Sequence, residues 1–382
     1  MTEPVRIAIV AGESSGDLLG AGLIQALKHH YPHVEFSGIG GPKMLEQGFH
    51  SFFPQDRLAV MGLVDPLMRL PELLKIRRFL FEHFTEHKPD LFLGIDSPDF
   101  NLTLEEKLRK AGVTTAHYVS PSVWAWRSGR IKKIKRAVDL MLTILPFENV
   151  IYQQHQVPVK FVGHPLADEI AMQPDKKSAR QQLQLDEQSA VVALMPGSRH
   201  SEVERLGPLF FQAAKLMLKQ RHGLTFVLPA ASGQRYKQLH QMLGPHSELP
   251  VKLVQGQSQE VMAAADVVLL ASGTTALEAM LLKKPMVVSY KMAWLSFQIM
   301  KAMALVRFVA LPNLLADREL VPELLQSDAT PEQMAEAVLR YFDAPELTSE
   351  LIDEFKRQHH TLKCDANASA ASALVELIEG QS

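Results

Sequence analysis

Short apolar runs alternate with segments of helical periodicity along most of the chain. The run VRIAIVA (5–11) precedes LLGAGLIQALKHH (18–30), where apolar residues recur at helical spacing, and LFLGI (91–95) precedes NLTLEEKLRKAG (101–112) in the same way. Each run is apolar at nearly every position and is bounded by Gly or Pro. Strands of this kind, separated by helices, are typical of a parallel sheet with helices on both faces.

The alternation pauses in the polar stretch 173–189 and restarts with AVVALM (190–195). We therefore predict an α/β chain of two Rossmann-like domains, 1–165 and 166–344, whose parallel sheets face each other across a cleft. Ligands bind beyond the carboxyl ends of such strands. The helical segment 345–382 is a candidate to return to the first domain. The other strands of the second sheet are predicted within GLTFVLPAA (223–231), VKLVQG (251–256), ADVVLLASG (265–273) and KPMVVSY (284–290).

The composition narrows the class of protein. The 40 basic and 42 acidic side chains leave a net charge of −2, which gives no support to bulk nucleic-acid binding. The single cysteine, Cys364, excludes a disulfide framework and a zinc site built from cysteines. The start MTEPVRIAIV lacks the features of a signal peptide, and no uncharged apolar run reaches the roughly 20 residues that cross a bilayer. We expect a soluble cytoplasmic protein.

The first Gly-rich turn, GESSGDLLG (12–20), does not fit a phosphate-binding loop. It is neither G-x-G-x-x-G nor a Walker sequence, and the carboxylates of Glu13 and Asp17 would repel a phosphate. Carboxylates accept hydrogen bonds from hydroxyl and amide groups, so the turn is better suited to a sugar. The alternative is a tight strand–helix turn in which a Ser or Asp caps the helix.

The turn MPGSR (195–199) is a better candidate for binding a diphosphate. Gly197 lets the backbone approach a ligand closely, and Ser198 stands at a predicted helix N-terminus, where free N–H groups favour anions. Arg199 adds a planar fork of donors suited to a diphosphate. The alternative is a capping turn with a solvated arginine.

The turn after VVLLA (267–271) completes this hypothesis. It offers hydroxyl and backbone donors at another predicted helix start, and Glu278 lies one turn beyond Thr274 on the same face. A carboxylate there can accept hydrogen bonds from both ribose hydroxyls, and the alternative is a surface glutamate. We predict a nucleotide diphosphate on the second domain. The donors of this turn are Ser272, Gly273, Thr274 and Thr275.

Eight motifs spread over nearly the whole chain resemble those of the lipid-A-disaccharide synthase family. They read AGESSGD, GIDSPDFN, HYVSPSVWAWR, LPFE, GHPLAD, PGSRHSEV, LLASGTTALEAM and LPNLLADREL. The resemblance implies an inverting glycosyltransferase of the two-Rossmann GT-B type that needs no metal and no cofactor. Such an enzyme transfers 2,3-diacylglucosamine from its UDP form to 2,3-diacylglucosamine 1-phosphate (lipid X), forming the β(1→6) disaccharide 1-phosphate and UDP.

Inverting transfer needs a base, and Asp96 stands at the carboxyl end of a predicted strand, where the cleft is expected. The alternative is that Asp96 caps the following helix, although Ser97 and Asp99 are better placed to do so. The resemblance adds Glu202 and Asn313 to the donor side. The residues expected on the acceptor side are Glu13, Ser15, Gly16, Asp17, Trp126 and Arg127.

Three segments mix cations with apolar residues. The segment 127–136 carries six basic residues, which suit an acceptor phosphate or an anionic membrane surface, or form a solvated helix face. The stretches 58–84 and 292–312 combine Leu, Met and aromatic residues with Lys and Arg, as interfacial helices do. We expect peripheral contact with the inner membrane of a Gram-negative bacterium through 58–84, with 292–312 as a second candidate. Ordinary amphipathic packing is the alternative, and the oligomeric state stays open, a homodimer included.

Three other functions compete with this one. A UDP-N-acetylglucosamine 2-epimerase would use the same scaffold on a water-soluble substrate, which does not need the apolar, basic stretches. A UDP-sugar transferase with another lipid-linked acceptor would need them but would lack GIDSPDFN and SPSVWAWR. A non-catalytic nucleotide-binding module leaves Asp96 without a role.

Overall fold

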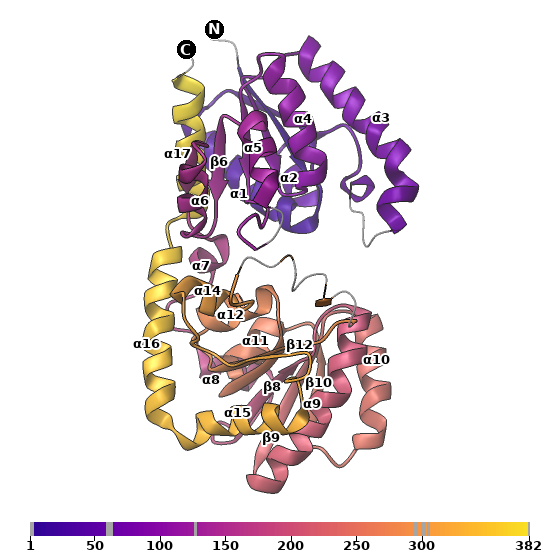
Figure 1. Cartoon of the computed structure of the whole chain (residues 1–382), viewed down its shortest axis with the longest axis vertical. Helices are drawn as coiled ribbons and strands as arrows, with labels where there is room; N and C mark the ends of the chain where they lie inside the picture. Colours follow the sequence, from indigo (N-terminus) through magenta and orange to yellow (C-terminus); the bar gives the residue numbers. More distant parts are fainter. Residues whose placement is uncertain are drawn as a thin grey trace. The chain divides into compact units, whose positions relative to one another are not determined.

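The computed structural model describes residues 4–58, 64–125, 128–293, 297–298, 303 and 306–380 (Figure 1). The chain forms two compact units. The first comprises Met1–Asp168 together with Leu362–Ser382, and the second comprises Glu169–Thr361. Each unit has its own parallel sheet and its own hydrophobic core.

Among the described residues of the first unit, seven strands form one parallel sheet in the order β3-β2-β1-β4-β5-β6-β7. The order of the chain reverses between β1 and β4, whose carboxyl ends therefore lie side by side with their following loops. This is the switch point at which open parallel sheets bind ligands. The strands are β1 (Val5–Ala11), β2 (Val34–Ile39), β3 (His50–Ser51), β4 (Leu91–Ile95), β5 (Thr115–Tyr118), β6 (Leu140–Thr143) and β7 (Val159–Phe161).

The helices of this unit are α1 (Ser14–His30), α2 (Pro42–Glu46), α3 (Val64–Glu86), α4 (Pro98–Lys110), α5 (Ile131–Ala137), α6 (Glu148–Gln154), α7 (Pro165–Glu169) and α17 (Ala366–Glu379). They cover both faces of the sheet, because successive side chains of β1 point to opposite faces and are buried on both. Ile7 and Ile9 pack in a cluster with α1 and α17, whereas Ala8 and Val10 pack on the opposite face with α3 and α4. Successive side chains of a strand point to opposite faces, so a strand buried on both faces must be apolar throughout.

Among the described residues of the second unit, the parallel sheet has the order β10-β9-β8-β11-β12-β13. The order reverses between β8 and β11, which again brings two loops together at the carboxyl edge. The strands are β8 (Ala190–Met195), β9 (Leu224–Ala230), β10 (Val251–Gln255), β11 (Val267–Ala271), β12 (Met286–Tyr290) and β13 (Glu323–Leu325). The helices are α8 (Lys176–Gln182), α9 (His200–Gln220), α10 (Gly233–Leu243), α11 (Ser258–Ala264), α12 (Thr274–Leu281), α14 (Leu311–Ala316), α15 (Pro331–Asp343) and α16 (Pro345–Leu362).

Helices α9 and α15 cover one face of this second sheet. Phe210, Phe211 and Met217 of α9 are fully buried in a cluster with Phe226 and Leu228 of β9. Burying a side chain of this size contributes roughly 1.5–3 kcal/mol, so this face holds the loops that follow β8 and β11 on a rigid support.

The predicted fold class is confirmed: both units are parallel-sheet Rossmann-like layers, and the last helix returns to the first unit. Figure 1 shows α17, in yellow, beside the indigo and magenta elements of that unit. The carboxylate of Asp168 accepts hydrogen bonds from the backbone N–H groups of Asp365 (2.9 Å) and Ala366 (2.7 Å), which fixes the start of α17. Gly22 of α1 lies so close to Asn367 that a Cβ there would come within 2.5 Å of its amide nitrogen.

The predicted C-terminal segment 345–382 is divided between the two units. Helix α16 belongs to the second unit, where the Gln358 amide donates to the carbonyl of Pro312 over 3.0 Å. The return to the first unit begins at Leu362, whose carbonyl accepts a hydrogen bond from the backbone N–H of His164 (2.8 Å).

Candidate functional site

Asp96 follows β4 in a sharp turn that the surrounding backbone holds in place. Asp96 and Ser97 both adopt left-handed conformations, with φ of +51° and +44°, before α4 begins at Pro98. The buried amide of Asn101 donates to the carbonyls of Asp96 (2.8 Å) and Val10 (3.1 Å). Two successive non-glycine residues in this region cost free energy, and such strain is found where a side chain must be aimed.

The carboxylate of Asp96 remains available. Its backbone N–H donates to the carbonyl of Tyr118 over 2.9 Å, but no described residue donates a hydrogen bond to its side chain. The helix cap is Ser97, without a capping hydrogen bond from its side chain, and Asp99 pairs with Arg130 at 2.5 Å. The capping alternative for Asp96 therefore has no support in the geometry.

The loop after β1 lies against this turn. A Cβ on Gly12 would come within 2.3 Å of the Ser97 hydroxyl, and one on Gly16 would meet Ala11 and Ile95 at 3.3 and 3.5 Å. Two glycines thus allow the turn after β1 and the first turn of α1 to pack directly on the segment that carries Asp96. Glu13, which caps α1, and Ser15, in its first turn, are exposed, and their role on the acceptor side remains a prediction.

Asp17 has a structural role that the sequence did not indicate. It is buried, and its carboxylate accepts three hydrogen bonds from backbone N–H groups, those of Gly41 (2.9 Å), Lys43 (3.0 Å) and Met44 (2.9 Å). These groups lie at the start of α2 and have no partner within the helix. The carboxylate therefore holds α2 against α1, and the geometry gives no support to its predicted contact with an acceptor.

The motifs HYVSPSVWAWR and LPFE meet in one buried network. The indole of Trp124 donates to Glu148 over 3.1 Å, the backbone N–H of Leu145 donates to the same carboxylate over 3.2 Å, and the hydroxyls of Ser120 and Tyr152 lie 2.7 Å apart. Burial raises the pKa of Glu148 to about 7. Sequence reasoning assigned no role to Glu148, although its motif was among those that carried the resemblance. The predicted acceptor residues Trp126 and Arg127 lie outside the described residues.

In the second unit, the two predicted nucleotide loops line one cavity of about 560 Å³. It lies at the carboxyl edge of the sheet, where β8 and β11 end. Gly256 and Ser258, after β10, also line it, and a Cβ on Gly256 would meet nothing within 4 Å. The sequence analysis missed these two, although QGQS follows a predicted strand. The predicted residues that line the cavity are Gly197, Ser198, Arg199, Glu202, Ser272, Gly273, Thr274, Thr275 and Glu278.

Glu202 occupies the anion-binding groups at the start of α9. Its carboxylate accepts hydrogen bonds from the backbone N–H groups of Ser198 and Arg199, both at 3.1 Å, and from the Arg199 guanidinium at 2.9 Å. Gly197 has a φ of +117°, and a Cβ there would come within 2.6 Å of Glu202. A phosphate at this position would have to displace a carboxylate of the protein itself.

The start of α12 is the less obstructed anion site. Its cap, Gly273, has no side-chain hydrogen bond, and a Cβ on it would meet nothing within 4 Å. The first N–H groups of a helix have no partners within it and favour negative charge. Glu278 is half-buried one turn along α12 and lines the same cavity; burial raises its pKa, opposed by a hydrogen bond with Gln259.

Asn313 lies outside the lining of this cavity. It is fully buried, and its amide donates to Val321 O and Glu323, at 2.9 and 2.8 Å. Its carbonyl accepts hydrogen bonds from the backbone N–H groups of Leu320 (2.8 Å) and Val321 (3.0 Å). Because all four hydrogen bonds are made within the chain, Asn313 supports the loop before β13, and the predicted direct contact with the donor gains no support.

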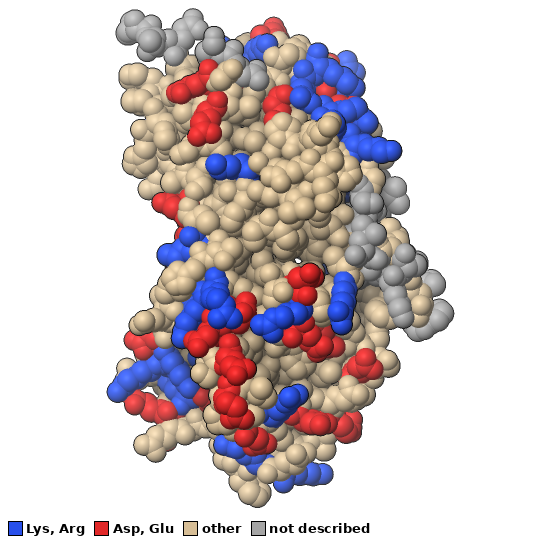
Figure 2. All heavy atoms as spheres, turned by 60° about the vertical axis from the view of Figure 1, so that its left-hand side comes forward, with Lys and Arg blue, Asp and Glu red and all other residues tan. Residues whose placement is uncertain are grey.

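Two surfaces of the first unit carry the predicted membrane features. Helix α3 buries Ile76 and Leu80 but leaves Leu70, Leu74 and Phe79 more than two-fifths exposed. A hollow of about 540 Å³ on α4 and α5 is lined by Arg109, Lys110, Lys132, Lys135 and Arg136. Lys and Arg side chains also gather on the upper right of the face drawn in Figure 2.

Residues 294–296, 299–302 and 304–305 of the second candidate segment, Trp294 and Lys301 among them, lie outside the described residues, as do 59–63 in the first. In the part of the chain that the structure describes, no helix is long and apolar enough to cross a bilayer. Within the same residues, no group of three or more His, Cys, Asp or Glu side chains is arranged to hold a metal ion.

Solved structures share this arrangement of two parallel-sheet units. The UDP-GlcNAc 2-epimerase from Neisseria meningitidis, solved bound to UDP-GlcNAc, matches 99% of this chain and 100% of its own with a TM-score of 0.65 and 14% identity. The calicheamicin glycosyltransferase CalG4 matches 100% of this chain and 99% of its own with a TM-score of 0.60 and 16% identity. The chain has the GT-B fold that glycosyltransferases and such epimerases share.

Closer relatives identify the family. The family model of lipid-A-disaccharide synthetase matches residues 7–374. The lipid-A-disaccharide synthase of Cellvibrio japonicus is 58% identical to this chain, and the alignment covers 99% of each chain. The synthase of Hahella chejuensis is 55% identical over 98% of this chain and 95% of its own. The synthase of Pseudomonas aeruginosa UCBPP-PA14 is 51% identical over 99% of this chain and 100% of its own. The chain belongs to the lipid-A-disaccharide synthase family and is a glycosyltransferase.

Replacing Asp17 by Ala should lower stability rather than act on a bound acceptor. The change leaves three N–H groups at the start of α2 without their acceptor, which costs about 1–3 kcal/mol. The midpoint of urea unfolding measures this loss. Ser15→Ala, on the exposed side of the same loop, is the control and should change stability by less than about 0.5 kcal/mol. An unchanged midpoint for Asp17→Ala, with a raised KM for the acceptor, would contradict the structural role.

Proposed function

We propose that the chain transfers 2,3-diacylglucosamine from UDP-2,3-diacylglucosamine to lipid X with inversion, forming the β(1→6) lipid A disaccharide 1-phosphate and UDP. The observation that carries this proposal is the similarity to lipid-A-disaccharide synthases, 51% to 58% identical over nearly the full length of both chains. A cavity lined by both predicted nucleotide loops and a carboxylate left available at the switch point of the other sheet support it.

Asp96 is the proposed general base. Its carboxylate takes the proton of the acceptor 6-hydroxyl while that oxygen bonds to the anomeric carbon of the donor, on the face opposite to UDP. The bond from the anomeric carbon to the phosphate oxygen breaks, its electron pair leaves with UDP, and the proton passes from Asp96 to water. The left-handed turn and the Asn101 amide hold the backbone of Asp96 in place, which limits where its carboxylate can lie.

The second unit holds the leaving group in this proposal. Negative charge develops on the diphosphate as the bond breaks, and the N–H groups at the start of α12 face it together with the Arg199 guanidinium. Arg199 is three-quarters exposed and pairs with Glu202, so it can exchange this partner for a phosphate. Glu278 accepts hydrogen bonds from the ribose hydroxyls.

The first unit meets the lipid in this proposal. Both substrates carry acyl chains, which must be taken from a membrane, here the cytoplasmic face of the inner membrane. The exposed leucines of α3 provide apolar contact, and the cations lining the hollow on α4 and α5 attract anionic headgroups, each by on the order of 1 kcal/mol.

The competing epimerase function shares the fold, but its representative is 14% identical to this chain, whereas the synthases exceed 50%. A product assay separates the functions. The purified protein is incubated with UDP-diacylglucosamine, UDP-N-acetylglucosamine and lipid X, singly and in pairs, and the products are analysed by mass spectrometry. The proposal requires a tetra-acylated disaccharide phosphate from UDP-diacylglucosamine with lipid X, and its absence refutes the proposal.

Asp96→Asn should lower kcat by roughly 10²–10⁴-fold, because the amide cannot take the proton of the attacking hydroxyl. UDP binding, measured by calorimetry, should stay within twofold, since the side chain lies in the other unit. Asp99→Asn, three residues along and exposed, is the control and should retain activity. Wild-type turnover in Asp96→Asn would remove Asp96 from this role.

Arg199→Ala and Glu278→Gln should each weaken UDP binding by about tenfold or more, because each removes a charge-assisted contact worth about 1.5–3 kcal/mol. Isothermal titration with UDP measures the change. Arg205→Ala is the matched control, since Arg205 lies exposed on α9 and does not line the cavity. Equal affinity in Arg199→Ala and Arg205→Ala would show that Arg199 does not contact the diphosphate.

The double variant Leu70→Ser, Leu74→Ser should reduce binding to anionic phospholipid vesicles by about tenfold or more, because it removes two leucines that would otherwise be buried in lipid. Sedimentation with the vesicles gives the bound fraction. Val150→Ser, at another exposed apolar position of the first unit, should sediment as the unchanged chain does. If the double variant binds equally well, α3 is not the contact surface.

A further inference from the structure

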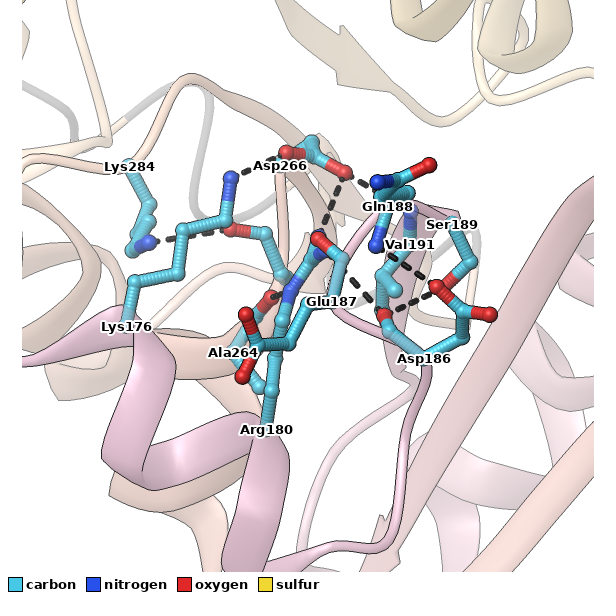
Figure 3. A network of polar contacts seen from close by, with 11 residues as sticks. Lys176, Arg180, Asp186, Glu187, Gln188, Ser189, Val191, Ala264, Asp266 and Lys284 are labelled. Carbon is cyan, nitrogen blue, oxygen red and sulfur yellow. Dashed lines mark hydrogen bonds and ion pairs between the residues drawn. The ribbon is translucent and has the colours of Figure 1, made fainter.

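A second polar cluster lies in the second unit, at the edge of the sheet opposite the nucleotide cavity. Asp266 directly precedes β11 and Lys284 precedes β12 by two residues, so both stand where strands begin rather than where they end. Figure 3 shows the Asp266 carboxylate between the Lys176 amine and the Arg180 guanidinium, which come from α8. The proposed transfer reaction uses none of these residues.

The carboxylate of Asp266 is fully engaged by other partners. One oxygen pairs with the Lys176 amine, and the other accepts hydrogen bonds from the Arg180 guanidinium (3.0 Å) and the backbone N–H of Val191 (2.8 Å). Arg180 is itself buried and also donates to the carbonyl of Ala264 over 3.0 Å. One carboxylate therefore balances two fixed cations before Lys284 is counted.

Lys284 has no carboxylate partner among the described residues. It is 7% exposed, and its amine donates to the carbonyl of Ala265 over 2.9 Å. Burial, Lys176 and Arg180 lower the pKa of the amine to about 7, and Asp266 opposes them. A large fraction of this amine is therefore neutral at physiological pH, with a nitrogen lone pair that an exposed lysine rarely offers.

Two further groups face the cluster from other elements. The Lys283 amine donates to the carbonyl of Ala171 and contacts His359 of α16. The hydroxyl of Tyr341, on α15, donates to the carbonyl of Met286 over 3.1 Å. Neither supplies a negative charge, so the surroundings of Lys284 keep an excess of positive charge.

Lys284 lines a cavity of about 390 Å³, together with Ala265, whose carbonyl accepts the hydrogen bond from its amine. The polar wall of the cavity includes Lys176, Asp266 and Lys284, and its apolar wall includes Phe342 and Ile352. The cations attract a small anion, and the apolar wall accommodates a short acyl group. The cavity therefore combines a nucleophile with a place for both halves of an acyl phosphate.

We propose that Lys284 is a covalent modification site, acylated by small acyl phosphates that enter this cavity. The amine nitrogen attacks the acyl carbon, a nitrogen–carbon bond forms, and the bond from that carbon to the phosphate oxygen breaks. Inorganic phosphate leaves with the electron pair, held by Lys176 as its charge develops, and the proton of the amine passes to water. The product is an uncharged amide, so this position can no longer take up a positive charge in a cluster that already has an excess of cations.

The pH dependence of acetylation tests this on the unchanged protein. The chain is incubated with acetyl phosphate between pH 6 and pH 10, and acetylation at each lysine is followed by mass spectrometry of its peptides. Exposed Lys237 serves as the internal reference. At pH 7 the neutral fraction of an ordinary lysine is about a thousandfold smaller than that of Lys284. The burial of Lys284 restricts the access of the reagent, so we expect this lysine to react only about tenfold faster than Lys237. Its rate should rise up to about pH 7 to 8 and then level off, whereas a lysine of ordinary pKa gains reactivity up to pH 10.

Two variants on α8 test the contribution of the neighbouring cation. The positive charge of Lys176 attracts phosphate and lowers the pKa of Lys284. Lys176→Met removes this charge, so acetylation of Lys284 at pH 7 should fall about tenfold. Lys177→Met removes the same charge from the next residue, which pairs with Glu187 on the surface, and should leave the rate unchanged. The ratio of the acetylation rate at Lys284 to that at Lys237 should also be smaller with phenyl acetate, because this uncharged reagent is not attracted by the cations. Equal rates at Lys284 and Lys237, or equal effects of the two variants, would overturn the proposal. None of these readouts depends on the transferase activity.

Discussion

Parallel strands all end at the same edge of a sheet, and both units of the chain depend on this constraint. Where the order of the strands reverses, the loops that follow two adjacent strands lead away to opposite faces of the sheet and leave room for a ligand between them. Each sheet has one such point among its described strands. In the first unit it joins the loop after β1 to the Asp96 turn, and in the second it joins the loops after β8 and β11. The proposed base and the proposed nucleotide cavity thus follow from the topology, and the residue types at these points decide the chemistry.

Backbone N–H groups that strands and helices leave without partners shape the surroundings of these points. Asp17 satisfies those at the start of α2, Glu202 those at the start of α9, and Asp168 those at the start of α17. Glu202 does so within its own helix start, whereas Asp17 and Asp168 reach segments far away in the sequence. Two of these three acidic residues, Asp17 and Glu202, were candidates for ligand contact in the sequence and act as acceptors for the backbone in the structure.

The fold could be predicted because its signal is local. An apolar strand, a Gly turn and an amphipathic helix recur within about thirty residues, and their number and order indicate two parallel sheets. Most of the polar lining of the cavity could also be predicted, since Gly197 and Gly273 each stand two residues after an apolar strand, but Gly256 and Ser258 were missed. The roles of Asp17 and Asn313 could not, because their partners lie elsewhere in the chain: Asp17 bonds to the segment 41–44, and Asn313 to 320–323. A polar residue beside a glycine turn looks the same in sequence whether it faces a ligand or the backbone of another element.

The pairing of Arg199 with Glu202 gives the proposed nucleotide cavity a form of selectivity. A carboxylate three residues away already pairs with the positive charge of Arg199. An anion that offers only one contact gains little by breaking this pair, so the abundant inorganic phosphate of a cell competes weakly. A ligand that simultaneously reaches the start of α12 and Glu278 gains enough from those contacts to separate the pair. In the proposed function, Glu202 would thus favour a ligand that spans the cavity over a small anion.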